Sequence, residues 1–139
     1  MPTVSVRTIP TGDDLSLQRG DTWAITFYRL GDISGRDKLW FTLKDDKGDA
    51  DTAALVEIEE SAGLEIINGA AADTPANGSI TVTNAALGDV TVALEAVESA
   101  KLADVGNLFY DIQMYDDPTV TTMVRGRAVL MGDVTRETS

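Results

Sequence analysis

The sequence contains no cysteine and no histidine. The first absence excludes disulfides, thiolate zinc sites and cysteine nucleophiles, and the second excludes every acid–base or metal scheme that uses an imidazole. Most common hydrolase machinery is therefore ruled out. The chemistry that remains open consists of carboxylate pairs, Ser–Lys dyads and calcium held by oxygen ligands.

Long apolar runs are missing as well. No stretch approaches the roughly 20 residues that a helix needs to span a bilayer. The first ten residues, MPTVSVRTIP, have neither the apolar core nor the cationic start of a signal peptide. We therefore expect a chain that is made in the cytoplasm and has no membrane partner.

Basic residues are few. Lys and Arg number 11 against 23 Asp and Glu, so the formal net charge is −12. A protein this acidic repels phosphate backbones and anionic lipid surfaces. Nucleic acid is therefore not expected as a partner, whereas basic patches on other proteins would attract the chain.

The rest of the composition is that of an ordinary folded domain. Hydrophobic residues make up 43% of the 139 residues and charged residues 24%, close to the averages for globular proteins. No linker or low-complexity tract divides the chain. We predict a single domain over residues 1–139, in which residues 1–14 form either an N-terminal arm or an edge strand.

Apolar and polar residues alternate with a period of two along most of the chain, which is typical of strands with one buried face. The clearest runs are TWAITFYRL at 22–30 and KLWFTLK at 38–44. Weaker or shorter runs lie at 4–9, 55–60, 63–68, 79–84, 90–95, 108–116, 119–124 and 127–134. The residues expected to face the core include Trp23, Ile25, Phe27, Leu39, Phe41, Leu43, Leu64, Ile66, Leu108, Tyr110, Ile112 and Met114. The pattern predicts nine or ten short strands.

Clusters of Gly, Asp and Asn separate these runs at intervals of about ten residues. Because no long amphipathic helix lies between them, the runs favour an all-β antiparallel sandwich or barrel. Helical spacing occurs only at 96–106, where one or two turns ending at Gly106 would cross between two sheets. The strongest local prediction is a hairpin of residues 108–114 and 120–124 with its turn at Asp117.

The tripeptide Arg19-Gly20-Asp21, which many adhesive proteins present to integrins, lies directly before the run at 22–30. Integrin recognition needs the tripeptide at the tip of a protruding loop. A turn into a strand needs only the conformational freedom of Gly. We interpret the tripeptide as a turn.

The acidic run DDKGDAD offers Asp45, Asp46, Asp49 and Asp51 as oxygen ligands for calcium. The run departs from the EF-hand loop because Lys47 occupies the third position, where an acidic or amide ligand is required. We therefore predict a solvated turn between two strands and no metal site.

Four glutamates, Glu57, Glu59, Glu60 and Glu65, could supply the carboxylate pair that glycoside hydrolysis uses. Alternation instead places Glu57 and Glu59 on one exposed face of a strand, opposite its apolar residues. We therefore expect no catalytic pair here, and no enzyme.

The triplet Asn77-Gly78-Ser79 matches the acceptor sequence for N-glycosylation. Asn-Gly is also the commonest two-residue hairpin turn, and it stands directly before the run at 79–84. We interpret the triplet as a turn.

Four aromatic residues, Tyr28, Trp40, Phe109 and Tyr115, fall on the faces opposite the expected core residues of their strands. Two interpretations are open. Either a second layer buries these side chains at the edge of a sandwich, or they contact another protein, because aromatic residues are enriched at interfaces. They are the candidate interface residues of the sequence.

A set of ordered phrases is more specific. LQRGDTW, the segment DISGRDKLWFTLKDDKGDADTAALVEIEE, GLEIINGAAA, GSITVT, GDVTVAL, LFYDIQMYD and RGRAVLMGDVTRETS follow one another along the chain. Together they resemble a group of small tailed-phage virion proteins with an immunoglobulin-like β-sandwich, related to the N-terminal domain of baseplate upper proteins. The resemblance runs from about residue 15 to residue 137.

The resemblance implies an immunoglobulin-like sandwich that acts as a non-enzymatic structural protein of the virion, without a cofactor. Its partners would be other virion proteins in a symmetric assembly, a homo-oligomer included. Two locations are open, the tail or baseplate and the capsid, where it would be a decoration or cement protein. The alternative function is a carbohydrate-binding module in which Tyr28, Trp40 and Tyr115 stack on sugar rings. A third is a carboxylate hydrolase that uses Glu57.

Overall fold

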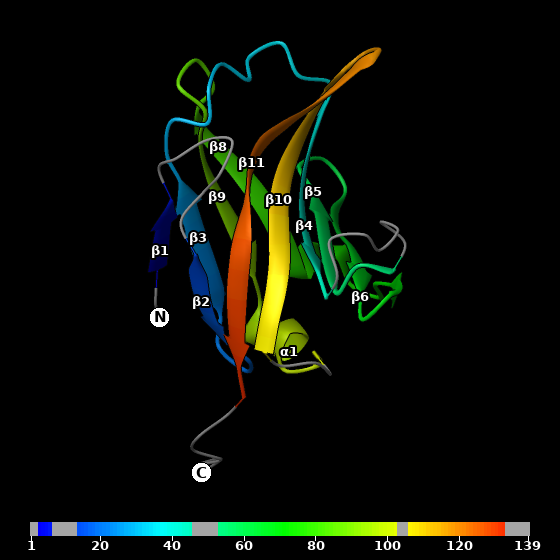
Figure 1. Ribbon diagram of the computed structural model, residues 1–139. Coiled ribbons are helices and arrows are strands. Elements are labelled where there is room, and N and C mark those ends of the chain that lie inside the picture. Colours follow the sequence, from blue (N-terminus) through cyan, green and yellow to red (C-terminus); the bar gives the residue numbers. More distant parts are fainter. Residues whose placement is uncertain (1–2, 7–13, 46–52, 103–105, 133–139) are drawn as a thin grey trace.

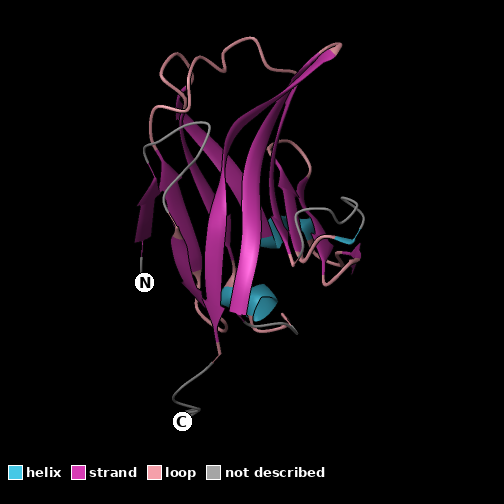
Figure 2. Ribbon diagram, in the orientation of Figure 1, coloured by secondary structure: helices cyan, strands magenta, loops and turns pink. Residues whose placement is uncertain are grey.

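The computed structural model describes residues 3–6, 14–45, 53–102 and 106–132, which form two sheets packed as a sandwich (Figures 1 and 2). The strands of the four-stranded sheet are, in spatial order, β1 (Thr3–Val6), β3 (Trp23–Phe27), β9 (Asp89–Leu94) and β8 (Gly78–Asn84). Those of the seven-stranded sheet are β2 (Leu15–Gln18), β11 (Thr119–Met131), β10 (Gly106–Asp116), β4 (Lys38–Lys44), β5 (Val56–Glu59), β6 (Gly63–Ile67) and β7 (Ala70–Ala71).

The strand order is that of a variable-type immunoglobulin domain. Such domains pair strands A, B, E and D in one sheet and G, F, C, C′ and C″ in the other. Here β1-β3-β9-β8 matches the first order and β11-β10-β4-β5-β6 the second, with β2 added parallel to β11. The prediction of an all-β immunoglobulin-like sandwich is confirmed, but two of its strand pairs, β1–β3 and β2–β11, are parallel where antiparallel pairing was expected.

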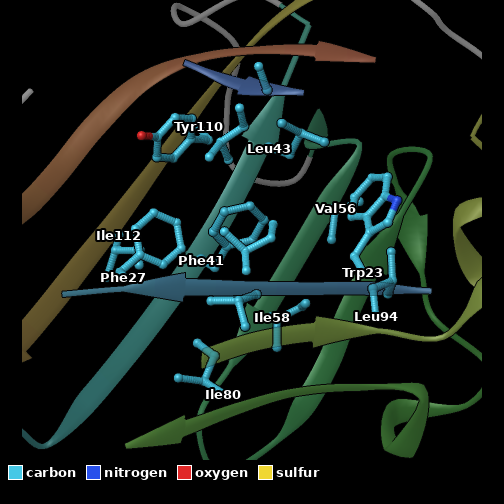
Figure 3. Close-up of a cluster of buried hydrophobic side chains, with 14 of the residues drawn as sticks. Trp23, Phe27, Phe41, Leu43, Val56, Ile58, Ile80, Leu94, Tyr110 and Ile112 are labelled. Carbon is cyan, nitrogen blue, oxygen red and sulfur yellow. The ribbon is translucent and has the colours of Figure 1, made fainter. Parts of the chain in front are cut away.

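Three aromatic rings link the sheets at the centre of the core (Figure 3). The ring of Phe27 on β3 lies 5.8 Å from that of Tyr110 on β10 and 6.3 Å from that of Phe41 on β4, measured between centroids. Antibody domains use a disulfide between strands B and F, packed against a Trp on strand C. This cysteine-free chain places an aromatic residue on each of the three corresponding strands, and we interpret their packing as a substitute for the cross-link.

Bulges interrupt three of the described strand pairs, β10–β11, β5–β6 and β8–β9, and the first two bear on the predictions. In β6 the extra residue Glu65 interrupts the pairing with β5, so Leu64 and Ile67 are buried and Ile66 is only half-buried. The prediction that Ile66 faces the core was therefore wrong. In β11 the extra residue is Met123, and the two runs expected at 119–124 and 127–134 form one continuous strand that ends at Met131.

The helical crossover is a single turn. Helix α1 (Ala96–Ser99) follows β9 of the four-stranded sheet, and the chain then enters β10 of the other sheet. Gly106 is the first residue of β10, so the prediction that it ends the helix was wrong. None of the helices in the described residues is long and apolar enough to cross a membrane.

Candidate functional site

The tripeptide Arg19-Gly20-Asp21 forms the tight turn between β2 and β3, as predicted. The N–H of Gly20, whose φ is 91°, donates to the hydroxyl of Ser99 on α1 at 3.1 Å. That hydroxyl donates to the carbonyl of Asp21 at 2.6 Å, and the N–H of Arg19 donates to the carbonyl of Met131 at 2.9 Å. The turn is thus held against the fold by hydrogen bonds to the Ser99 hydroxyl and the Met131 carbonyl, and it does not form the tip of a protruding loop.

Gly20→Val should lower the free energy of unfolding by about 2 kcal/mol, because a β-branched residue is strained at positive φ. Urea denaturation followed by tryptophan fluorescence measures the change. Arg19→Lys, which keeps the turn backbone, should differ from the natural protein by less than about 0.5 kcal/mol. Equal stability of the Gly20→Val variant and the natural protein would contradict this account of the turn.

The acceptor triplet for glycosylation is built into the fold. Asn77 ends the short 3₁₀ helix η2 (Pro75–Asn77), and Gly78 begins β8, so the expected two-residue hairpin turn is not formed. The side-chain amide of Asn77 donates to Glu98 at 2.8 Å, and Lys101 lies 3.0 Å from the other carboxylate oxygen. Glu98 is only 1% exposed. The amide nitrogen that a glycan would occupy is therefore engaged with a buried carboxylate.

Glu98→Gln tests the charge in this network. The hydrogen bond from Asn77 and the proximity of Lys101 lower the pKa of Glu98, although burial acts in the opposite direction. Because the folded pKa lies below the ordinary value of 4.5, the folded state gains stability from this carboxylate above that pH and loses it as the pH falls through the folded pKa. We expect the variant to be about 1–2 kcal/mol less stable at pH 7.

Urea titrations of both proteins from pH 7 down to about pH 3 would measure this difference in unfolding free energy. The difference should stay constant down to the ordinary pKa and shrink below it. A difference that does not change with pH would contradict a role for the charge.

Two of the four glutamates, Glu59 and Glu60, are engaged in hydrogen bonds within the fold. Glu59 is buried, and its carboxylate accepts hydrogen bonds from the backbone N–H groups of Ser61 and Ala62 at 2.6 and 3.1 Å. The prediction of an exposed Glu59 was wrong because this side chain caps the β5–β6 turn. Glu60 accepts two hydrogen bonds of 2.6 Å from Arg36 and raises the pKa of that guanidinium.

The acidic run lies mostly outside the described residues. Asp45 is described and exposed, whereas Asp46, Asp49 and Asp51 are not described, so the predicted solvated turn stays a prediction. Among the described residues, no group of three or more acidic side chains is arranged to hold a metal ion.

The four candidate aromatic residues do not share one surface. Trp40 on β4 and Phe109 and Tyr115 on β10 lie on the outer face of the seven-stranded sheet, and all three are half-buried. Tyr28 directly follows β3 in the other sheet and is 38% exposed. A single sugar-stacking surface of Tyr28, Trp40 and Tyr115 is therefore not formed.

Trp40 is covered by its neighbours. The Tyr115 ring lies 6.3 Å from it between centroids, and the ammonium of Lys38 lies 5.9 Å from the centre of the indole ring. The Tyr115 hydroxyl donates to Asp117 at 2.7 Å, which together with burial and the nearby charge of Asp37 raises the pKa of the phenol. These contacts make the pair a packed cluster rather than an open stacking platform.

Strand β11 carries an exposed stripe that sequence reasoning missed. Three large apolar side chains point outward from it: Val120, Val129 and Met131 are 55%, 38% and 45% exposed. The exposed side chains of Arg125 and Arg127 lie between them. The alternation within RAVLM contains this signal, because burial of Ala128 and Leu130 leaves Val129 and Met131 outside.

Beside this stripe lies a groove of about 450 Å³, which we call the cationic groove. Its lining residues are Thr42, Lys44, Phe109, Tyr110, Asp111, Arg125, Gly126 and Arg127. Register explains the grouping, because Phe109 pairs with Lys44 on one side and with Arg127 on the other.

The cationic groove has three cationic side chains and one carboxylate in a protein of net charge −12. Within the part of the chain that the structure describes, Arg125 and Arg127 form no ion pair. Two unpaired guanidinium groups next to a half-buried Phe109 can bind carboxylates by paired hydrogen bonds.

No protein-family model matches the sequence, and no curated protein matches it. Among solved structures, the chain is similar to that of the RIG-5 IG1 homodimer, with a TM-score of 0.43 and 12% identity over 94% of this chain and 97% of the other. It is also similar to auracyanin B (TM-score 0.39, 16% identity, 93% and 88% covered) and to reduced rusticyanin (0.39, 12%, 92% and 79%). At these identities the likeness concerns the fold.

Proposed function

We propose that this chain is a non-enzymatic structural protein of a bacteriophage particle that docks on other virion proteins through the outer face of its seven-stranded sheet. The main observation in support of docking is the exposed stripe of β11 with the cationic groove beside it. The resemblance of the ordered sequence phrases to small virion proteins supports the phage assignment. The tail or baseplate and the capsid both remain as locations.

The composition of this face supports binding to protein. Interfaces are enriched in aromatic residues, Met and Arg and depleted of Lys and Glu at their centres. The stripe contributes Met131, Arg125 and Arg127, and the groove contributes Phe109. Val129 and Met131 are successive outward-facing residues of β11, and exposed apolar side chains that lie together mark interaction sites more strongly than scattered ones.

The arrangement of aromatic residues supports docking over sugar binding. A sugar ring stacks on an open aromatic face, whereas Trp40 is packed against Tyr115 and Lys38. Phe109 is half-buried between Lys44 and Arg127 in register. Both rings are therefore parts of a mixed polar and apolar surface, as at a protein interface.

The test is incorporation into particles of the phage that encodes the chain. Val129→Asp places a carboxylate in the exposed stripe without touching the core, so the copy number per purified particle should fall at least about tenfold. Val97→Asp is the matched control, because Val97 is 60% exposed on α1, which is not part of the seven-stranded sheet. Quantitative mass spectrometry of gradient-purified particles gives the copy numbers, and cryo-electron microscopy gives the location.

Two results would contradict the proposal. One is recovery of the natural protein solely in the soluble fraction of the infected host. The other is an equal loss of incorporation for Val97→Asp and Val129→Asp, because a docking face on the seven-stranded sheet predicts that only the second variant is excluded.

A further inference from the structure

The β10–β11 hairpin projects beyond the sandwich and is acidic at its tip (Figure 1). Residues 116–121 are all exposed. The tip carries Asp116 and Asp117, and Asp37 joins them because its carboxylate accepts the N–H of Asp117 at 2.9 Å. The N–H of Asp37 in turn donates to the carbonyl of Tyr115 at 2.7 Å. Three carboxylates are thus held together at one end of the hairpin.

The same two strands carry the cationic groove further along their length. Seven residues separate Asp116 from Phe109, which at about 3.4 Å per residue is roughly 24 Å. The strands between them are continuously paired from Asp116 to Gly106. The tip therefore cannot fold back into the groove of its own chain. The acidic tip and the cationic groove have complementary charges, but within one molecule they cannot contact each other.

From this juxtaposition we propose that the hairpin tip of one copy, residues 116–121, docks into the cationic groove of a second copy, so that the chain associates head to tail. The inference rests on the proposed docking function and names a partner for the same face. Asp116 of one copy would pair with Arg125 or Arg127 of the next. The exposed Val120 at the tip would contact the ring of Phe109.

The contact is favourable despite the overall charge of both copies. At physiological ionic strength charges more than about 8 Å apart are largely screened, whereas a bidentate guanidinium–carboxylate pair at the interface is not. Salt at physiological ionic strength should therefore weaken the long-range repulsion between two chains of charge −12 more than it weakens the guanidinium–carboxylate pair at the interface. The tip is also held in place by Asp37 before it binds, which reduces the entropy lost on docking.

The geometry sets the kind of assembly. The tip and the groove are different surfaces, so the contact is heterologous, and each added copy presents a new free tip and a new free groove. Such contacts produce rings when the rotation between copies closes and filaments when it does not. An isologous pair, by contrast, would stop at a dimer.

Sedimentation velocity of the purified full chain, alone and at about 0.15 M salt, tests the inference. The natural protein should show a sedimentation coefficient that rises with concentration up to about 1 mM. Arg127→Glu in the groove and Asp116→Lys at the tip should each weaken association at least about tenfold. An equimolar mixture of the two variants should regain association to within about threefold of the natural protein, because the reversed charges are again opposite.

Arg29→Glu is the matched control. It makes the same change in net charge at an exposed arginine that follows β3 in the other sheet, so association should be unchanged. A natural protein that stays monomeric up to about 1 mM would overturn the inference. The groove would then be expected to bind an acidic segment of a different protein. Equal effects of Arg29→Glu and Arg127→Glu, or a mixture that does not recover, would overturn it as well.

These outcomes separate the inference from the proposed function. Self-association is measured with one purified protein, whereas particle incorporation depends on the other virion proteins. A monomeric chain that is still incorporated into particles keeps the proposed function and rejects head-to-tail docking. A self-associating chain that is absent from particles keeps head-to-tail docking and rejects the proposed function.

Discussion

Gly88→Ala is expected to lower the free energy of unfolding by about 3 kcal/mol or more. Gly88 lies in the turn between β8 and β9 with φ at 81°, and a β-carbon built there would lie 2.2 Å from the carbonyl oxygen of Gly31 and 2.7 Å from its nitrogen. Both atoms belong to the backbone, so they cannot rotate away. The carbonyl of Gly88 also accepts the N–H of Leu30 at 3.1 Å. Relieving the clash would therefore disturb the pairing between two loops.

Gly69→Ala separates the clash from the backbone conformation. Gly69 has φ at 75°, but the atom nearest to a β-carbon there is 3.9 Å away, on Ala53. This control should lose only about 1 kcal/mol from positive φ. Urea denaturation of both variants, analysed with one common m-value, gives the two losses of unfolding free energy to be compared. Equal losses for Gly88→Ala and Gly69→Ala would show that the close contact between loops has no energetic weight.

Phe41→Ala is expected to cost about 3–5 kcal/mol, because it removes a large buried ring and leaves a cavity that rigid strands cannot close. Phe41 is fully buried and contacts the rings of both Phe27 and Tyr110. Since domains have about 5–15 kcal/mol of stability, the loss would be a large part of the whole. We expect the variant to show a much lower denaturation midpoint and a weakened near-ultraviolet circular dichroism signal.

Phe109→Ala is the matched control for this prediction. It makes the same change on the neighbouring strand β10, but on the outer face, where the ring is half-buried. A loss of less than about 2 kcal/mol is expected there, because less area is buried and no internal cavity forms. A cost at Phe41 as small as that at Phe109 would mean that the three-ring contact does not replace the missing disulfide.

The core and the fold class could be predicted because both depend on local patterns. Alternation in 22–30 and 38–44 correctly placed Trp23, Phe27 and Phe41 inside, since successive strand residues point to opposite faces. The turn nature of Arg19-Gly20-Asp21 followed from a Gly beside a strong strand. The sheet order did not follow from these patterns and is known only from the observed strand pairing.

The candidate site could be predicted only in part. The sequence placed Trp40, Phe109 and Tyr115 on outer faces, and the structure confirms this, but it could not tell that Tyr28 lies on the other sheet. It also suggested an exposed Glu59, which is buried as a turn cap. For Tyr28 the missing information was which sheet its strand joins, and for Glu59 it was the local conformation of the β5–β6 turn.

By itself the sequence determined that this chain is an acidic all-β domain without cysteine or histidine chemistry, because composition and period-two alternation are properties of the chain alone. The tertiary structure decided which cationic side chains lie together in the groove. Lys44, Phe109 and Arg127 are far apart in the chain and become neighbours only because β4, β10 and β11 pair in one register. A groove made by three strands is a property of their pairing, and no single strand contains it.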